Sequence, residues 1–262
     1  MYKAFNLSAI EIPRDDDYAQ IGRGQNDSYA GKVRQALDVF VTGGALQGNA
    51  LQQHWFPTLQ ADVFISHSHS DESMAMGLAG WLWKYFKLRA FVDSSVWGHA
   101  DHLLWEIDTE CCRNEGRDTF SYEKRNGSTS HVHMMLSTAL GMMIDRTECL
   151  IFLNTPQSIT SKGVVSKTQS PWIFSELVTA KSIRRTIPAR HRRDPTLNFS
   201  AEEVRTKTAS ALKIHYQVDL TPFADIDADT LNAWNRAYDG SEHALDALYA
   251  ITPKDEIEVL SE

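Results

Sequence analysis

Residues 170–177, with the sequence SPWIFSEL, place a carboxylate four positions after a tryptophan. Ser170 suits a helix N-cap and Pro171 suits the first helical position, so a helix is expected to begin here. Because residues four apart share a helix face, Trp172 and Glu176 point the same way. An acid beside an indole can hold a sugar and a flat base together. The same pattern also fits an ordinary amphipathic helix with a surface glutamate.

A second set of polar residues follows a predicted buried strand. Residues 61–71 read ADVFISHSHSD, and the apolar run in them stops at small and polar side chains. Asp71 can cap a following helix, and a second short strand then ends at Asp93. Open parallel sheets bind ligands at the carboxyl ends of their strands. The candidate binding residues are therefore Ser66, His67, Ser68 and Asp93, with Trp97 as a ring that can stack on a base.

Four motifs, in the same order along the chain, resemble the Toll/interleukin-1 receptor (TIR) domain family. They are DVFISHSHSDE, AFVDSSVWG, CLIFLNT and SPWIFSEL, and the resemblance covers roughly residues 61–250. The last is the most specific, since the family's Ser-x-Trp-x-x-x-Glu-Leu pattern is matched by Ser170, Trp172, Glu176 and Leu177. After Asp93 the chain departs from the family pattern, with Gly98 as a loose match.

The resemblance implies a fold and an activity. The fold would be α/β, a flavodoxin-like parallel five-stranded sheet flanked by helices. In the enzymatic branch of the family, the glutamate at the position of Glu176 is required to cleave NAD at its nicotinamide–ribose bond. Bacterial members serve in defence against phage, and a protein that makes an ADP-ribose-derived signal for a separate effector would resemble the Thoeris-type systems. In this family the loop after the second strand, here residues 94–102, often completes the site of a neighbouring protomer, which implies a homo-oligomer.

Cleavage of the nicotinamide–ribose bond requires mainly a correctly positioned carboxylate. The nicotinamide leaving group already carries positive charge, so no general acid is needed to protonate it. A carboxylate such as Glu176 can stabilise the oxocarbenium-like transition state and hold the ribose hydroxyls. Trp172 can offer an aromatic wall. NAD is then the substrate, and neither a cofactor nor a metal is expected.

Other functions fit parts of the same pattern. Many TIR domains are non-catalytic scaffolds that act by TIR–TIR association. A nucleoside deoxyribosyltransferase-like enzyme would also use a glutamate, but it explains the SHSHSD strand end less well. Ser66, His67 and Asp71 make a poor hydrolase triad, because adjacent serine and histidine cannot easily adopt its geometry. His67 and His69 alternate along an extended segment, which makes them a poor metal pair.

Composition indicates a globular protein of the cytoplasm. The chain has 262 residues, of which 42 % are hydrophobic and 23 % charged, as in ordinary soluble folds. A net charge of −8 argues against a general nucleic-acid binder, which needs a basic face. Three cysteines make no disulfide framework, and no apolar run is long enough to span a membrane.

The pattern of elements predicts two regions. Residues 1–60 are expected to form an N-terminal extension, a helical hairpin of helices at 29–42 and 45–55, with a strand near 4–12. Residues 61–252 are expected to form the TIR-like domain, with an insertion at about 113–131. Its fourth strand is expected near Thr186 and Ile187, and its fifth at 211–220.

Overall fold

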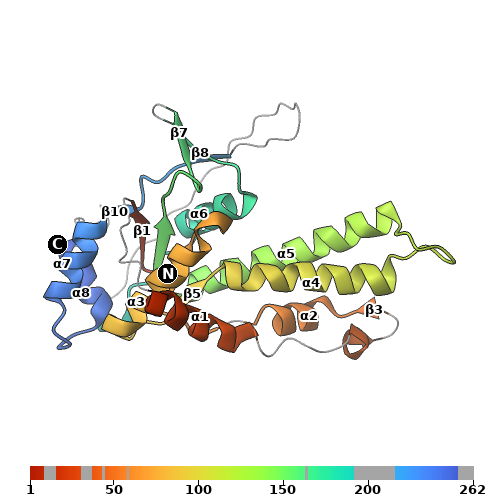
Figure 1. Ribbon diagram of the computed structural model, residues 1–262, viewed down its shortest axis with the longest axis horizontal. Coiled ribbons are helices and arrows are strands. Elements are labelled where there is room, and N and C mark those ends of the chain that lie inside the picture. Colours follow the sequence, from red (N-terminus) through yellow and green to blue (C-terminus); the bar gives the residue numbers. More distant parts are fainter. Residues whose placement is uncertain are drawn as a thin grey trace.

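In the computed structural model, a five-stranded, all-parallel sheet forms the centre of the protein (Figure 1). The structure describes residues 1–8, 16–30, 37–42, 45–57, 59–162, 165–191 and 216–252. The strand order is β10-β1-β6-β4-β5. The bounds of the strands are β1 Lys3–Leu7, β4 Val63–Ser66, β5 Ala90–Val92, β6 Cys149–Leu153 and β10 Ala224–Ile226. This confirms the predicted α/β class with a parallel sheet flanked by helices.

Helices cover both faces of the sheet, because side chains of each strand alternate between two cores. One core holds Phe64, Phe91 and Phe152 and packs under α2, α4, α5 and α6. The other holds Val63, Ile65 and Ile151 and packs under α1, α3, α7 and α8. The helix bounds are α1 Asp16–Ala30, α2 Gly48–Trp55, α3 Glu72–Phe86, α4 Ser94–Cys111, α5 Tyr122–Arg146, α6 Pro171–Ser182, α7 Ala228–Ala237 and α8 Ala244–Ile251.

The fourth and fifth positions of the sheet are filled by strands other than the predicted ones. The fourth is β1, which confirms the start of the strand predicted near 4–12 but places it in the sheet, where it pairs with β6 from Lys3↔Cys149 to Leu7↔Leu153 and is buried along its whole length. The fifth is β10, which pairs with β1. The prediction at Thr186 and Ile187 is wrong, because these residues form no strand: the Thr186 N–H donates to the Met1 carbonyl at 2.9 Å, but no ladder follows, and Ile187 is exposed.

The strand predicted at 211–220 is observed in part, but its predicted place as the fifth strand of the central sheet is wrong. Its described part contains β9 (Tyr216–Val218), which pairs antiparallel with β8 (Val165–Thr168) in a separate small sheet completed by β7 (Thr160–Lys162). Residues 211–215 lie outside the described residues. The side chains of β9 are only partly buried, whereas a strand inside the central sheet is covered on both faces.

The first 60 residues do not form the predicted helical hairpin. They contribute β1 to the middle of the sheet and α1 to one of its faces, so part of this segment lies within the α/β core. Of the predicted helix at 45–55, only Gly48–Trp55 is helical, as α2. In the predicted helix at 29–42, residues 37–40 form a short 3₁₀ turn, which is followed by a ribbon of β2 (Val41–Thr42) and β3 (Ala45–Leu46). Residues 31–36 lie outside the described residues.

The predicted loop after the second strand is a helix. Residues 94–102 begin α4, which runs antiparallel to α5 as a long helical hairpin (Figure 1). The expected insertion at about 113–131 is the turn between these two helices together with the start of α5 at Tyr122. A backbone bridge between Arg113 and Phe120 closes the turn. Further short 3₁₀ turns are His69–Asp71 and Ala189–His191. In the described part of the chain, no helix has the length and apolar character needed to cross a membrane.

Candidate active site

Helix α6 turns Glu176 toward the sheet. Ser170 caps the helix, its Oγ accepting a hydrogen bond from the Ile173 N–H at 3.3 Å, and Pro171 follows at the first position. Both predictions for the helix start are confirmed. Ile173 and Leu177 are buried in the core below, and Glu176 lies on this buried side with 2 % of its surface exposed. The alternative of an ordinary helix with a surface glutamate is therefore excluded.

Glu176 contacts the last residue of β4. Ser66 Oγ donates a hydrogen bond of 2.6 Å to Glu176 Oε2, and Ser66 is fully buried. The sequence brings the two together because β4 ends at Ser66, while the cap fixes where α6 begins and hence which turn carries Glu176. A hydroxyl donor of this kind stabilises the ionised form of a buried acid.

The next residue along the chain makes a buried ion pair. His67 Nδ1 lies 2.6 Å from Asp93 Oδ1, and both side chains are fully buried. Asp93 directly follows β5, the neighbour of β4, so the carboxyl ends of two adjacent strands supply the pair. We call Ser66, His67, Asp93 and Glu176 the Glu176 cluster.

Burial and proximity shift the proton equilibria of this cluster. Burial, followed by the charge of Asp93, raises the pKa of Glu176 well above its usual range, and the hydrogen bond from Ser66 only partly opposes this. Burial alone would lower the pKa of His67, but the charge and hydrogen bonding of Asp93 outweigh it and raise that pKa. The raised pKa values of Glu176 and His67 both favour the protonated forms of these two side chains.

The cluster lies where parallel sheets of this kind hold ligands. The chain passes from β4 outward to β5 on one side, and then to β6 on the other side of β4. The order in which the chain adds strands to the sheet therefore reverses between β4 and β6, which makes this place a topological switch point. In open parallel sheets, a crevice for ligands forms outside the carboxyl ends of the two strands at the switch point. Ser66 and His67 stand at the end of β4 in this place.

Asp71 is a buried polar residue at the same edge whose role differs from the predicted one. It stands at the start of α3 but its side chain does not cap the helix. Instead, Asp71 Oδ2 accepts hydrogen bonds from Ser68 Oγ and Thr155 Oγ1, each at 2.5 Å. Asp71 therefore ties the segment after β4 to the segment after β6. The Ser-x-x-Asp spacing of Ser68 and Asp71 could have indicated their hydrogen bond. The contact with Thr155 could not have been predicted from the sequence, because Thr155 lies 84 residues away.

Three predicted site residues make no described contact with the cluster. Ser68 turns to Asp71. Trp172 is half-buried on α6, with its ring edge-on to His133 of α5 at 5.5 Å between ring centroids. Trp97 belongs to α4, and its side chain lies outside the described part of the structure.

One group of residues elsewhere has the spacing of metal ligands. Atoms of Glu148, His243 and Asp246 lie within 4.8 Å of one another. Arg190 already binds this group, with bonds of 2.6 Å to Glu148 Oε1 and to Asp246 Oδ1. The guanidinium supplies the positive charge that these carboxylates need, so the group is explained as an ion-pair network.

Comparisons with known proteins give no further assignment: no family model, no curated protein and no solved structure matches this chain.

Proposed function

We propose that this protein cleaves NAD at the bond between nicotinamide and ribose, with Glu176 as the catalytic carboxylate. The observation that supports this best is the placement of Glu176. It is a buried acid held by Ser66 and facing Asp93, at the switch point of a parallel sheet. A carboxylate kept away from water stabilises a developing positive charge far better than one in solvent.

The reaction needs one bond broken and one formed. The C1′–N bond of the nicotinamide riboside breaks, and its electron pair leaves with nicotinamide, which becomes neutral. Water adds to C1′ and releases a proton, giving ADP-ribose; attack by an adenine nitrogen instead would give a cyclic product. Glu176 stabilises the oxocarbenium-like carbon between these two events.

The resting protonation state of the cluster suits a cationic substrate. A raised pKa favours protonated Glu176 in the empty site. A nicotinamide ring carries a positive charge, and an opposite charge nearby favours the ionised carboxyl. Binding of NAD is therefore coupled to loss of a proton from Glu176, which turns it into the carboxylate that the reaction requires.

The remaining predicted residues take supporting roles in this proposal. Ser66, His67 and Asp93 position the ribose end of NAD, Trp172 and Trp97 offer rings, and Ser68 shapes the loop after β4. We propose that the enzyme works in the cytoplasm as a homo-oligomer. Its product would be an ADP-ribose-derived signal for a separate effector, or NAD depletion, in antiphage defence. Neither nucleic acid nor a membrane takes part.

The test is incubation of the purified protein with NAD, with and without lysate of phage-infected cells, and identification of the products by mass spectrometry. We expect nicotinamide and linear or cyclic ADP-ribose from the wild type. Glu176→Gln should lose at least about 100-fold in rate, as removal of a single charge-stabilising group commonly does. Glu110→Gln is the matched control, because Glu110 is exposed on α4. Equal rates for Glu176→Gln and wild type would overturn the assignment.

A non-catalytic scaffold remains the second candidate, and one observation favours it. Every member of the Glu176 cluster is 2 % exposed or less, so substrate reaches Glu176 only if the neighbouring segments move. A scaffold would show no nicotinamide release under any of these conditions, and its self-association would be unaffected by Glu176→Gln. An enzyme that opens on assembly would show activity that rises with protein concentration.

A further inference from the structure

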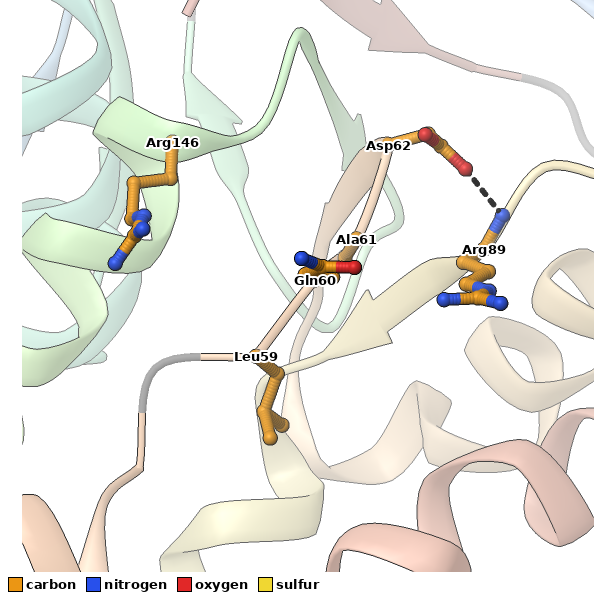
Figure 2. Close-up of a pocket in the computed structure, with 6 residues that line it drawn as sticks. All are labelled: Leu59, Gln60, Ala61, Asp62, Arg89 and Arg146. Atoms are coloured by element: carbon orange, nitrogen blue, oxygen red, sulfur yellow. Dashed lines mark hydrogen bonds between the residues drawn. The ribbon is translucent and has the colours of Figure 1, made fainter.

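A cavity of about 430 Å³ lies at the edge of the sheet opposite the Glu176 cluster. It opens at the amino ends of β4 and β5, whereas the cluster lies at their carboxyl ends. The lining residues are Leu59, Gln60, Ala61, Asp62, Arg89 and Arg146 (Figure 2). The volume falls within the range of small-molecule sites.

Two arginines from distant parts of the chain line this cavity. Arg146 is the last residue of α5, Arg89 directly precedes β5, and Figure 2 shows them on opposite sides of Gln60. Both arginines are exposed, and neither guanidinium has an ion pair or hydrogen bond with the described residues. A cation at a helix C-terminus is favourable by itself, which accounts for Arg146. It does not account for Arg89.

The single acid of the lining is already engaged by the backbone. Asp62 Oδ2 accepts the Arg89 backbone N–H at 2.8 Å, and the Asp62 backbone N–H donates to the Arg89 carbonyl at 2.8 Å. This exchange joins the starts of β4 and β5 and fixes the backbone of Arg89. The lining side chains then carry two positive charges and one negative charge, in a protein whose net charge is −8.

We propose that this cavity binds a small phosphate-bearing ligand between Arg89 and Arg146. Guanidinium groups present paired donors that match phosphate oxygens, and two of them suit a diphosphate better than a single phosphate. The Gln60 amide lies between the two arginines as a further donor (Figure 2). Leu59 and Ala61 offer an apolar surface to the uncharged part of such a molecule.

The experiment is isothermal titration of the full chain with pyrophosphate, with inorganic phosphate and with adenosine. We expect pyrophosphate to bind more tightly than phosphate, adenosine to give no signal, and added salt to weaken binding of the anions. Arg89→Gln and Arg146→Gln should each weaken pyrophosphate binding by about tenfold, the usual worth of a charged hydrogen bond. The matched control is Arg117→Gln, at an exposed arginine in the turn between α4 and α5, which should bind as wild type does.

A substitution that should strengthen binding distinguishes this site from a general effect of surface charge. Asp62→Asn keeps an acceptor for the Arg89 N–H but removes the negative charge, so it should tighten pyrophosphate binding. Circular dichroism of each variant shows whether the fold is kept. Absence of binding to the wild type would overturn the proposal. Equal losses for Arg89→Gln and Arg117→Gln would also overturn it, because the binding would then not belong to this cavity.

Discussion

Ser66 and Glu176 are 110 residues apart in the chain, and the Ser66 hydroxyl donates a 2.6 Å hydrogen bond to the Glu176 carboxyl. This bond joins the end of a central strand to the second turn of a capped helix. It also opposes, without overcoming, the effect of burial and of Asp93 on the pKa of Glu176. The Ser66 hydroxyl therefore orients the acid, while burial, followed by the charge of Asp93, raises its pKa.

Glu176→Gln should make the protein more stable at neutral pH. A buried acid with a raised pKa stabilises the fold only while it is protonated. That contribution is complete below the unfolded-state pKa of about 4.3 and is lost as pH rises through the higher folded-state pKa. Glutamine can still accept from Ser66 and has no such loss, so the gain should be about 1 kcal/mol, as is common when a functional acid is removed.

Urea unfolding at pH 5 and pH 8 measures this effect. The stability advantage of Glu176→Gln over wild type should grow from the lower to the higher pH, while Glu110→Gln follows wild type at both. A variant that is less stable than wild type at pH 8 would show that the ionised carboxylate is the native form.

Asp93→Asn should lower the pKa of His67, because Asp93 is what raises it against the opposing effect of burial. A histidine with a raised pKa contributes stability that is complete below its unfolded pKa of about 6.5 and is lost as pH rises through the folded value. The variant should therefore lose about 3 kcal/mol of stability at pH 6, as removal of one partner of a buried ion pair commonly does, and less at pH 9.

Titration of His67 by nuclear magnetic resonance tests the same prediction directly. The His67 signal should change at lower pH in Asp93→Asn than in the wild type. An unchanged His67 titration would mean that the 2.6 Å contact with Asp93 carries no electrostatic coupling.

Asp71→Ala should destabilise the loops at the carboxyl edge of the sheet. It removes the acceptor shared by the Ser68 and Thr155 hydroxyls, which are both buried. A buried hydroxyl without a partner costs about 1–3 kcal/mol. Asp101→Ala, at an exposed position of α4, should change stability by less than about 0.5 kcal/mol. Equal midpoints of thermal unfolding for the two variants would show that Asp71 does not stabilise the contact between the segments after β4 and β6.

The crossing of α1 and α3 should depend on two glycines. A Cβ at Gly22 would lie 2.0 Å from the Met76 carbonyl oxygen, and one at Gly80 would lie 1.8 Å from that of Tyr18. Alanine at either position must push the helices apart, which should cost at least about 1–3 kcal/mol. Thermal unfolding measures the loss.

The same two helices provide matched controls for this prediction. A Cβ at Gly24 of α1 or Gly77 of α3 would meet no atom within 4 Å. Gly24→Ala and Gly77→Ala should therefore be neutral or stabilising by up to about 1 kcal/mol, since alanine favours the helix more than glycine does. Destabilisation by all four substitutions would point to helix α1 or α3 as a whole and not to the crossing.

Local patterns in the sequence determined the elements that carry the candidate site. The apolar runs before Ser66 and Asp93 predicted two strands that are observed, because buried parallel strands are continuous in apolar residues. The Ser170-Pro171 start of α6 was also predicted, because caps depend on a few neighbouring residues. The placement of Ser66, His67 and Asp93 at carboxyl strand ends followed from these elements.

The tertiary structure decided which distant segments meet and which side chains are buried. The position of β1 between β6 and β10 depends on pairing across more than 140 residues, which leaves no local pattern. The burial of Glu176 was missed because an acid on a helix is usually exposed, and the Ser66 hydroxyl that donates to it comes from a strand 110 residues earlier in the chain. The ion pair of His67 with Asp93 and the hydrogen bond from Thr155 to Asp71 likewise form only when distant strands become neighbours in the sheet. The local sequence of a strand does not determine which strands lie beside it.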